Sequence, residues 1–322
     1  MRQSSFLYLF SAAFFTIFMG FFSHQVKAQE FSNAGEYWDA IMSAQSKVMS
    51  KSVGYVSKSV HSDNDRIIER KRRAVVSQID ESLARLKELK AFNGNDRFRK
   101  EALAVLQQMK NIYTIEFKEA SSLQKNSQSS YLAMERYYKA QDHAEAKLDR
   151  ADKRFKAASK YFAKQNNIKI VNEGRKDDAI EKMGQVNRYT RSIYLIDFKL
   201  SKANAGFMDA FEAKKAGVME RHRKKTLAAA REALNKLKAV KDFYGNSDYK
   251  KAAEKIARYR KKFASKEYTE LVTFTKNSKK LTRKDVKRAN QIIQELNQKN
   301  NQYVQTFNMA GRALRQQYTP KQ

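Results

Sequence analysis

The chain has 322 residues, a formal net charge of +31 at neutral pH, no cysteine and one proline, Pro320. Without cysteine it has no disulfides, thiolate nucleophiles or thiolate metal sites, so the fold must be stabilised by packing. Because the only proline lies near the end of the chain, every predicted helix is free to run long.

Residues 1–28 have the pattern of a secretory signal peptide. Arg2 precedes an apolar run from Phe6 to Phe22, and Val26 and Ala28 are small residues at the two positions that a signal peptidase reads. The run is long for a signal and slightly short for a membrane span, so an uncleaved anchor is the alternative. No cysteine follows, which excludes lipoprotein anchoring. We expect export through the Sec pathway, to the periplasm or the outer cell surface.

Helical periodicity begins at Glu36, and the first predicted helix ends before a polar turn at 61–65. A helical hairpin over residues 72–117 comes next. After a loop near 121–130, a long helix carries apolar residues from Met134 to Phe162. These elements predict a first helical unit over residues 29–170. The apolar stripe of its first helix consists of Tyr37, Ile41, Ala44, Val48 and Tyr55.

The hairpin occurs twice. Shifted by 151 positions, the stretch from Arg72 to Phe117 falls on Arg223 to Tyr268 without a gap, and we interpret this as an internal duplication. Residues that meet identical partners include Glu81, Leu83, Leu86, Lys87, Lys90, Phe92, Gly94, Asn95, Lys100, Ala102, Lys110 and Glu116.

Each copy predicts two antiparallel helices joined by a tight turn. Gly94 and Gly245 are expected to take the left-handed backbone conformation that ends a helix. Asn95 or Asp96 in the first copy, and Asn246 in the second, are expected to cap the amides of the next helix. A binding-loop interpretation of Phe-x-Gly-Asn has little support, because Asn and Gly are the residues that such a turn needs in any case.

Residues 171–187 contain two glycines and several charges, which predicts a linker before a second unit over 188–322. A helix from Ile193 is expected to continue with only a bend at Gly217 into the second hairpin. The last helix is expected to start at a capping box of Thr282 and Asp285. The predicted fold is all-α, with two tandem antiparallel helical-bundle units of about four long helices each.

Motifs of known enzymes are missing from the sequence. Beyond the signal only His61, His143 and His222 occur, and none stands three residues after a glutamate as in di-iron bundles. There is no His-Glu-x-x-His, Gly-x-Ser-x-Gly, phosphate loop or calcium loop. Asp149 and Asp152 stand among lysines and are typical of a solvated helix face. We therefore predict a protein that is not an enzyme, with no cofactor, no metal and no small-molecule substrate.

Positive charge is concentrated in the second unit. Residues 29–180 hold 29 Lys and Arg against 21 Asp and Glu, whereas residues 181–322 hold 34 against 13. Tyr259 is the aromatic residue nearby that could stack on a ligand. Arg260 and Lys261 stand beside a basic face on the same predicted helix. The candidate anion-binding residues are Lys251, Lys255, Arg258 and Lys262 on that face, with Lys280, Arg283, Lys284 and Lys287 around the next loop and helix start.

Such a surface attracts polyanions, and its binding falls steeply with salt. The expected partners are lipopolysaccharide, anionic lipid, acidic polysaccharide, extracellular DNA or an acidic protein. The alternative is a lysine-rich surface that only keeps the protein dispersed.

Three stretches of the first unit carry a resemblance to a known family. They are Tyr37-Trp38-Asp39-Ala40-Ile41 followed by Gln45 and Val48, Phe92 with Gly94 before a helix, and the ending Tyr161-Phe162-Ala163-Lys164-Gln165-Asn166. Over residues 31–170 the chain resembles the leptospiral-type surface proteins, an exported helical family also present in Bacteroidota. The resemblance implies export and a surface or periplasmic location, and it brings no catalytic residues.

Two functional hypotheses follow. The first is a non-enzymatic exported protein whose basic second unit binds an anionic envelope component or an acidic partner. The second is a holdase-like chaperone, by analogy with the small basic helical chaperones of the periplasm, which are similar in charge and all-α character. A holdase would need an apolar cleft between helices as well as charge.

Overall fold

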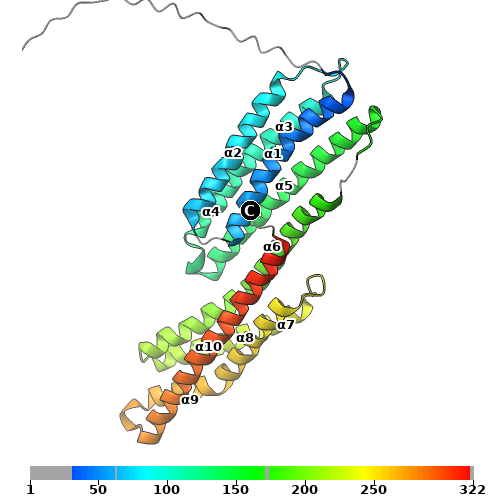
Figure 1. Ribbon diagram of the computed structural model, residues 1–322. Helices are drawn as coiled ribbons and strands as arrows, with labels where there is room; N and C mark the ends of the chain where they lie inside the picture. The colour runs from blue at the N-terminus through cyan, green and yellow to red at the C-terminus, as the bar shows by residue number, and fades with distance from the viewer. Residues whose placement is uncertain (1–30, 62–63, 171–173, 320–322) are drawn as a thin grey trace, which may run out of the picture.

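The computed structural model describes residues 31–61, 64–170 and 174–319, and all regular secondary structure within them is helical (Figure 1). The predicted all-α fold is therefore confirmed. The predicted signal peptide, 1–28, lies outside the described residues. So do the first residues of the predicted linker, and from Gly174 onward that segment is helical. No helix of the described part is long and apolar enough to cross a membrane.

The first unit begins with two antiparallel helices, α1 (Ala34–His61) and α2 (Asp65–Glu88). Helix α3 (Arg97–Asn111) continues through one π-helical turn (Ile112–Glu116) into α4 (Phe117–Gln124). A 3-10 turn (Ser127–Ser129) then leads into the long helix α5 (Tyr131–Gln165), whose N-cap Ser130 accepts a hydrogen bond from the Ala133 amide. Counting α3 and α4 as one bent rod, this unit has the four long helices that the sequence predicts.

The second unit has the same order of elements. Helices α6 (Gly174–Glu212) and α7 (Ala216–Ala239) are followed by α8 (Asp248–Ser265), α9 (Glu267–Lys276), a 3-10 turn (Ser278–Lys280) and α10 (Arg283–Tyr318). One expectation was wrong here. Helix α6 does not bend at Gly217: it ends at Glu212, and a short turn in which Lys214 has a φ of 53° reverses the chain into α7.

The shift of 151 positions that relates the two hairpins also relates the element boundaries of both units. It takes Asp65–Glu88 onto Ala216–Ala239, Ser127–Ser129 onto Ser278–Lys280, and the end of α1 at His61 onto the end of α6 at Glu212. Small departures of one to three residues occur at other helix ends, and the π-helical turn of the first unit corresponds to the break between α8 and α9. The largest departure is at the beginning of α6. This helix starts at Gly174, well before position 185, where Ala34 would fall. A common origin of the two units by duplication stays an inference from these correspondences.

The two helix-to-helix turns differ from the expected helix cap. Helix α2 ends at Glu88, and Phe92 and Asn95 exchange two backbone hydrogen bonds of 3.1 and 2.9 Å around Asn93 and Gly94. Both central residues have positive φ, 49° and 75°, which is the two-residue turn that Asn-Gly favours. The second copy repeats this geometry, with a φ of 82° at Gly245. The helix end and the glycine turn are therefore separate features.

Asn95 and Asn246 hold the first amide of the following helix. The Asn95 side chain accepts a hydrogen bond of 3.0 Å from the Arg97 amide, and Asn246 accepts one of 3.0 Å from the Asp248 amide. Of the two capping candidates in the first copy, Asn95 makes this bond, whereas Asp96 makes no side-chain cap.

An arginine, buried in the first unit and half-buried in the second, fastens each hairpin at the point where its second helix is interrupted. In the first unit Arg72 of α2 donates a hydrogen bond of 2.6 Å to the carbonyl of Tyr113, inside the π-helical turn. Arg223 of α7 donates one of 2.9 Å to the carbonyl of Ala264, just before the break between α8 and α9. Each guanidinium also pairs with a carboxylate on its own helix, Glu69 or Glu220.

The two units have different cores. In the first, apolar residues of α1, α2, α3 and α5 form one continuous cluster. In the second, the apolar residues fall into three clusters, and a polar layer lies between them. In that layer Arg260 of α8 pairs with Asp197 of α6 and donates a hydrogen bond of 2.8 Å to Ser201. The corresponding position of the first unit is Met109, 151 residues earlier.

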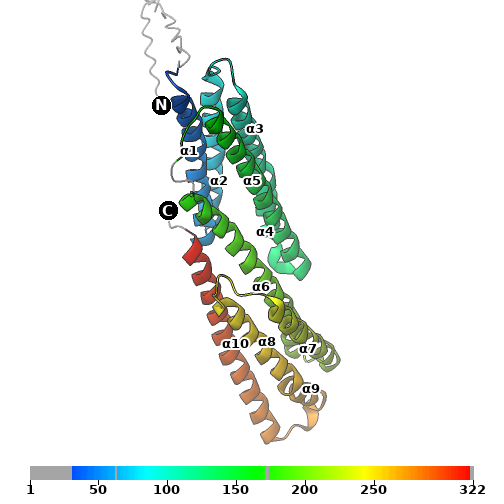
Figure 2. The same ribbon diagram turned by 90° about the vertical axis from the view of Figure 1, so that its right-hand side faces the viewer.

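The units lie end to end (Figures 1 and 2). The beginning of α6 packs along α5 of the first unit, and the end of α10 reaches α1. The far end of the molecule is formed by α9 and the start of α10 (Figure 2). Two places are of functional interest: the outer surface of the second unit, where the predicted basic residues lie, and the junction between the units.

Candidate functional site

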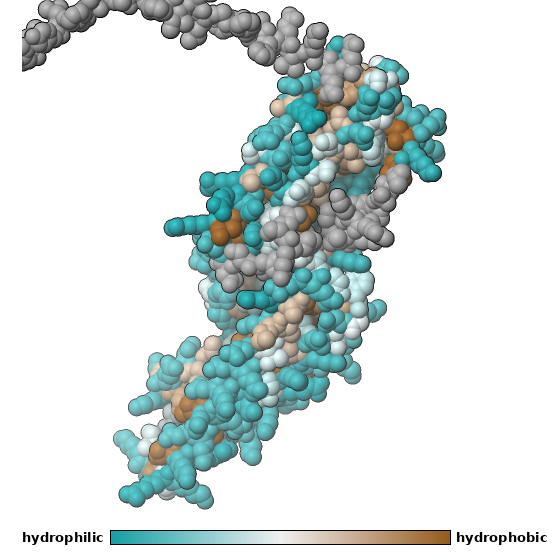
Figure 3. All heavy atoms as spheres, in the orientation of Figure 1, coloured by the Kyte–Doolittle hydropathy of each residue, from teal (hydrophilic) through white to brown (hydrophobic). Residues whose placement is uncertain are grey.

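The predicted basic stripe lies on the solvent face of α8. One side of this helix is buried, and on the other side Lys251, Lys255, Arg258 and Lys262 are all exposed. At 1.5 Å per residue the stripe is about 16 Å long. Figure 3 shows that the visible face of the second unit is largely hydrophilic, with apolar residues scattered over it.

The second predicted group lies at the end of the molecule farthest from the first unit. Lys280 closes the 3-10 turn after α9, and Arg283, Lys284 and Lys287 are exposed in the first turns of α10. The capping box expected at this helix start is present, since Thr282 and Asp285 each bond the backbone amide of the other. The two basic groups thus belong to neighbouring elements, and none of the described contacts joins one group to the other.

Most of this positive charge has no partner within the protein. Of the eight predicted residues, only Arg258 forms an ion pair with another described residue, Glu254, at 2.9 Å. In contrast, Arg288, one turn after Lys284, is bound by Glu270 at 2.8 Å. Unpaired exposed cations keep their full charge available to a ligand.

Two residues that the sequence placed beside this surface do not belong to it. Arg260 is buried, with 4% of its surface exposed, because it belongs to the polar layer of the core. Tyr259, which remained open for stacking, packs its ring against Phe263 and Tyr303, with centroids 4.5 and 5.2 Å away. The surface is therefore built from lysine and arginine without an aromatic platform.

At six of the eight predicted positions the first unit has an uncharged residue, and at the other two it also has a cation, Lys100 in place of Lys251 and Arg136 in place of Lys287. The positions that correspond to Lys255, Arg258 and Lys262 are Ala104, Gln107 and Asn111, and all three are exposed on α3. At the start of α5, Ser129, Leu132 and Ala133 stand where Lys280, Arg283 and Lys284 stand in the second unit. Charge at these positions is therefore not required by the fold.

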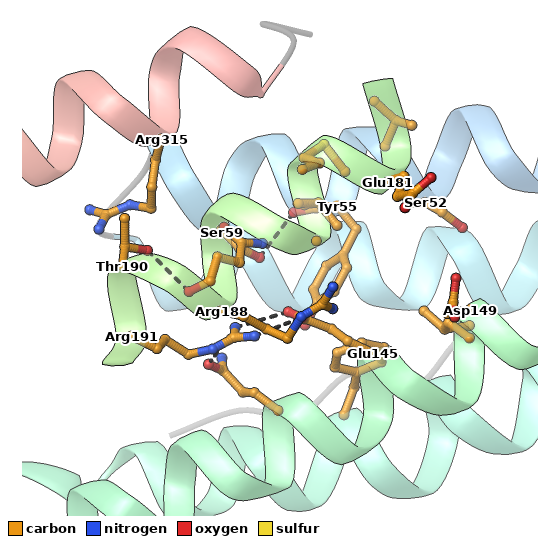
Figure 4. Close-up of a pocket in the computed structure, with 18 of the residues that line it drawn as sticks. Ser52, Tyr55, Ser59, Glu145, Asp149, Glu181, Arg188, Thr190, Arg191 and Arg315 are labelled. Atoms are coloured by element: carbon orange, nitrogen blue, oxygen red, sulfur yellow. Dashed lines mark hydrogen bonds and ion pairs between the residues drawn. The ribbon is translucent and has the colours of Figure 1, made fainter. Parts of the chain in front are cut away.

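A cavity of about 500 Å³ lies at the junction of the units, and the sequence did not predict it (Figure 4). Its walls come from α1, α5, α6 and the end of α10, with Tyr113 and Phe117 at the π-helical turn and Tyr249 at the start of α8. Six tyrosines line it: Tyr55, Tyr113, Tyr137, Tyr138, Tyr194 and Tyr249.

Arg191 of α6 ties the two units together beside this cavity. Its guanidinium lies 2.5 Å from Glu145 and 2.6 Å from Asp142, both on α5, and its side chain is only 9% exposed (Figure 4). Burial alone would lower the pKa of this guanidinium, but the carboxylates of Glu145 and Asp142 outweigh burial and hold the pKa above its ordinary value. The Arg191 guanidinium is therefore charged at any physiological pH.

The sequence contained a signal for this bridge that was not used. Asp142, Glu145, Asp149 and Asp152 recur at three and four along α5, so they share one helix face, and a face of one sign in a basic protein predicts a basic partner. Only its last two residues, Asp149 and Asp152, were expected to be typical of a solvated helix face. In the structure these two pair with Lys153 and Lys156 one turn away and line the cavity.

Among the described residues, no group of three or more His, Cys, Asp or Glu is placed to hold a metal ion. Comparison of the chain with protein-family models, with curated proteins and with solved structures gave no match. The resemblance to leptospiral-type surface proteins therefore stays a prediction, and the function must be argued from the surface and the cavity.

Proposed function

We propose that the protein is a non-enzymatic exported protein whose second unit binds an extended polyanion through the exposed cations of α8 and of the turn before α10. The observation that carries the proposal is the lack of internal partners for this charge: seven of the eight predicted cations form no ion pair with a described residue. A linear row of such cations suits a polymer better than a single small anion, because each cation can meet a successive charged group.

The comparison of the units supports the same proposal. The second unit has a cation at all eight of these positions, whereas the first unit has one at only two of them, Lys100 and Arg136. If the cations served only to keep the protein dispersed, there would be no physical reason for the other six to occur in one copy alone.

The holdase alternative has less support. The large exposed apolar side chains are Ile115, Leu132, Tyr161, Tyr244, Val286 and Met309, and they are spread over the π-helical turn, α5, the turn before α8, and α10. A holdase surface would gather such side chains into one patch.

Retention of the purified protein on immobilised lipopolysaccharide, acidic polysaccharide and DNA, measured across a salt series, tests the proposal. The informative variant is Lys255→Ala, Arg258→Gln and Lys262→Asn, which gives α8 the residues of α3. We expect the variant to elute at lower salt and, on DNA, the slope of log affinity against log salt to fall by about one unit for each cation that contacts phosphate. Unchanged elution on all three matrices would overturn the proposal.

A further inference from the structure

The cavity at the junction of the units has the size and position of a ligand site. Its volume of about 500 Å³ is within the range of pockets that hold small organic molecules, and such pockets often lie between units of a protein. One wall is formed by Glu181, Met183 and Gly184, which belong to the part of α6 that has no counterpart in the first unit. This extension of α6 therefore has a structural consequence, which is to supply part of the wall of the cavity.

The lining of the cavity holds five basic side chains and four carboxylates. Three of the carboxylates are paired within the protein, Glu145 with Arg191, Asp149 with Lys153 and Asp152 with Lys156. Two guanidinium groups of the lining, Arg188 and Arg315, have no hydrogen bond or ion pair to any described residue.

Of these two, Arg315 is better placed. It is half-buried, whereas Arg188 is exposed, and Figure 4 shows its side chain reaching from α10 toward Thr190 of α6. A half-buried guanidinium has lost part of its hydration, so an acidic group gains more by pairing with it.

Most of the remaining lining is apolar or aromatic. Met49, Val53 and Val56 of α1 line the cavity with Leu148 of α5, Met183 of α6 and the six tyrosines. The uncharged polar side chains of the lining are Ser52, Ser59, Gln141, Asn187, Thr190 and Asn308. Burial raises the pKa of both Tyr113 and Tyr137 to about 12, so these hydroxyls stay protonated and can donate hydrogen bonds at neutral pH. The lining thus offers apolar contact over most of its area and positive charge at one side.

We propose that this cavity binds a small amphipathic organic anion, with its apolar or aromatic body between α1, α5 and α6 and its acidic group on Arg315. The proposed ligand is a small molecule, whereas the sequence led us to expect no small-molecule substrate. The proposal is independent of the proposed polyanion surface on α8.

Two fluorescent probes with the same ring system test the proposal. Anilinonaphthalene sulfonate carries an acidic group, and phenylnaphthylamine lacks it. We expect one saturable site for each on the wild-type protein. Arg315→Gln should weaken binding of the sulfonate about tenfold, the effect of losing one charge-assisted hydrogen bond, and leave the uncharged probe within about twofold.

Three further variants complete the design. Val56→Trp fills the cavity and should abolish binding of both probes. Arg136→Gln, an exposed arginine of α5 outside the lining, should change neither, and the neutralised α8 variant should also change neither. If Val56→Trp fails to fold, as judged by circular dichroism, Arg315→Gln alone decides. Unsaturable or absent binding to the wild type, or equal weakening of both probes by Arg315→Gln, would overturn the proposal.

Discussion

The first and second units share their helix boundaries at a fixed shift of 151 positions but differ in two chemical respects. The first has a continuous apolar core and an outer face on α3 with Ala104, Gln107 and Asn111, whereas the second has a core interrupted by the Arg260–Asp197 pair and cations at the corresponding positions of α8. This arrangement of helices therefore requires neither the buried ion pair nor the basic face. Each of these features can be tested by replacing residues of the second unit with those of the first.

The largest effect is expected in the polar layer of the second core. Arg260→Met, the residue of the first unit, leaves Asp197 without its cation in a site where burial already raises the pKa of that carboxyl, and it should destabilise the protein by about 3 to 5 kcal/mol. Adding Asp197→Ser, again the residue of the first unit, should recover most of the loss. Denaturant unfolding followed by circular dichroism measures both, and equal stability of the single and double variants would contradict this account.

The arginines that fasten the two hairpins should differ in importance. The Arg72 side chain is 8% exposed and Arg223 is 16% exposed, and the bond of Arg72 to its carbonyl is shorter. We expect Arg72→Met to cost about 2 kcal/mol and Arg223→Met about 1 kcal/mol, because a buried charge-assisted hydrogen bond contributes more. Hydrogen exchange resolved by hairpin would show each loss in its own unit. Equal losses of stability in the two variants would show that the deeper burial of Arg72 does not make its hydrogen bond more important.

The two glycine turns, in contrast, should behave alike. A Cβ at Gly94 or Gly245 meets no atom within 4 Å, so Gly94→Ala and Gly245→Ala are opposed only by positive φ and should each cost about 1 kcal/mol. Gly217→Ala is the matched control, since its added Cβ also meets nothing but its backbone is helical. Melting temperatures would reveal the pattern, and a destabilised control would remove the explanation by φ.

The smallest effect is expected from acid. Hydrogen bonds from Arg72 lower the pKa of Glu69 from 4.5 to about 2, so its contribution to stability is present above pH 4.5 and is lost as the pH falls toward 2. Glu69→Gln should therefore lower the melting temperature at pH 6 and make little difference at the lower end of this window. A constant difference between the two proteins across this range would show that Glu69 is not held ionised by Arg72.

The sequence predicted what depends on local pattern. The apolar stripes located the helices, and the ungapped repeat predicted matching hairpins with Gly94 and Gly245 at their turns. It failed where tertiary contacts decide. Helix α2 ends at Glu88 because Asn93 and Gly94 form a separate turn, and no periodic signal marks that end.

The site was predicted unevenly for the same reason. Exposure of the α8 cations follows from their spacing on one helix. Arg260 also stands among basic residues in the sequence, but its side chain is buried and pairs with Asp197, a residue 63 positions earlier. The cavity depends on how α6 and α10 meet the first unit, and its residues are too far apart in the chain for any motif to reveal it.

The proposal that the α8 cations bind a polyanion is tested most directly by moving three of them to the first unit while the net charge stays constant. A variant that combines Lys255→Ala, Arg258→Gln and Lys262→Asn with Ala104→Lys, Gln107→Arg and Asn111→Lys carries the same charges on α3 instead of α8. We predict that this variant elutes from each polyanion matrix at lower salt than the wild type. The moved cations then lie on the first unit, whereas the cations at the start of α10 remain on the second, so one polymer can no longer bind both groups within one unit. Identical elution of the two proteins would show that overall charge alone is responsible and would contradict the account.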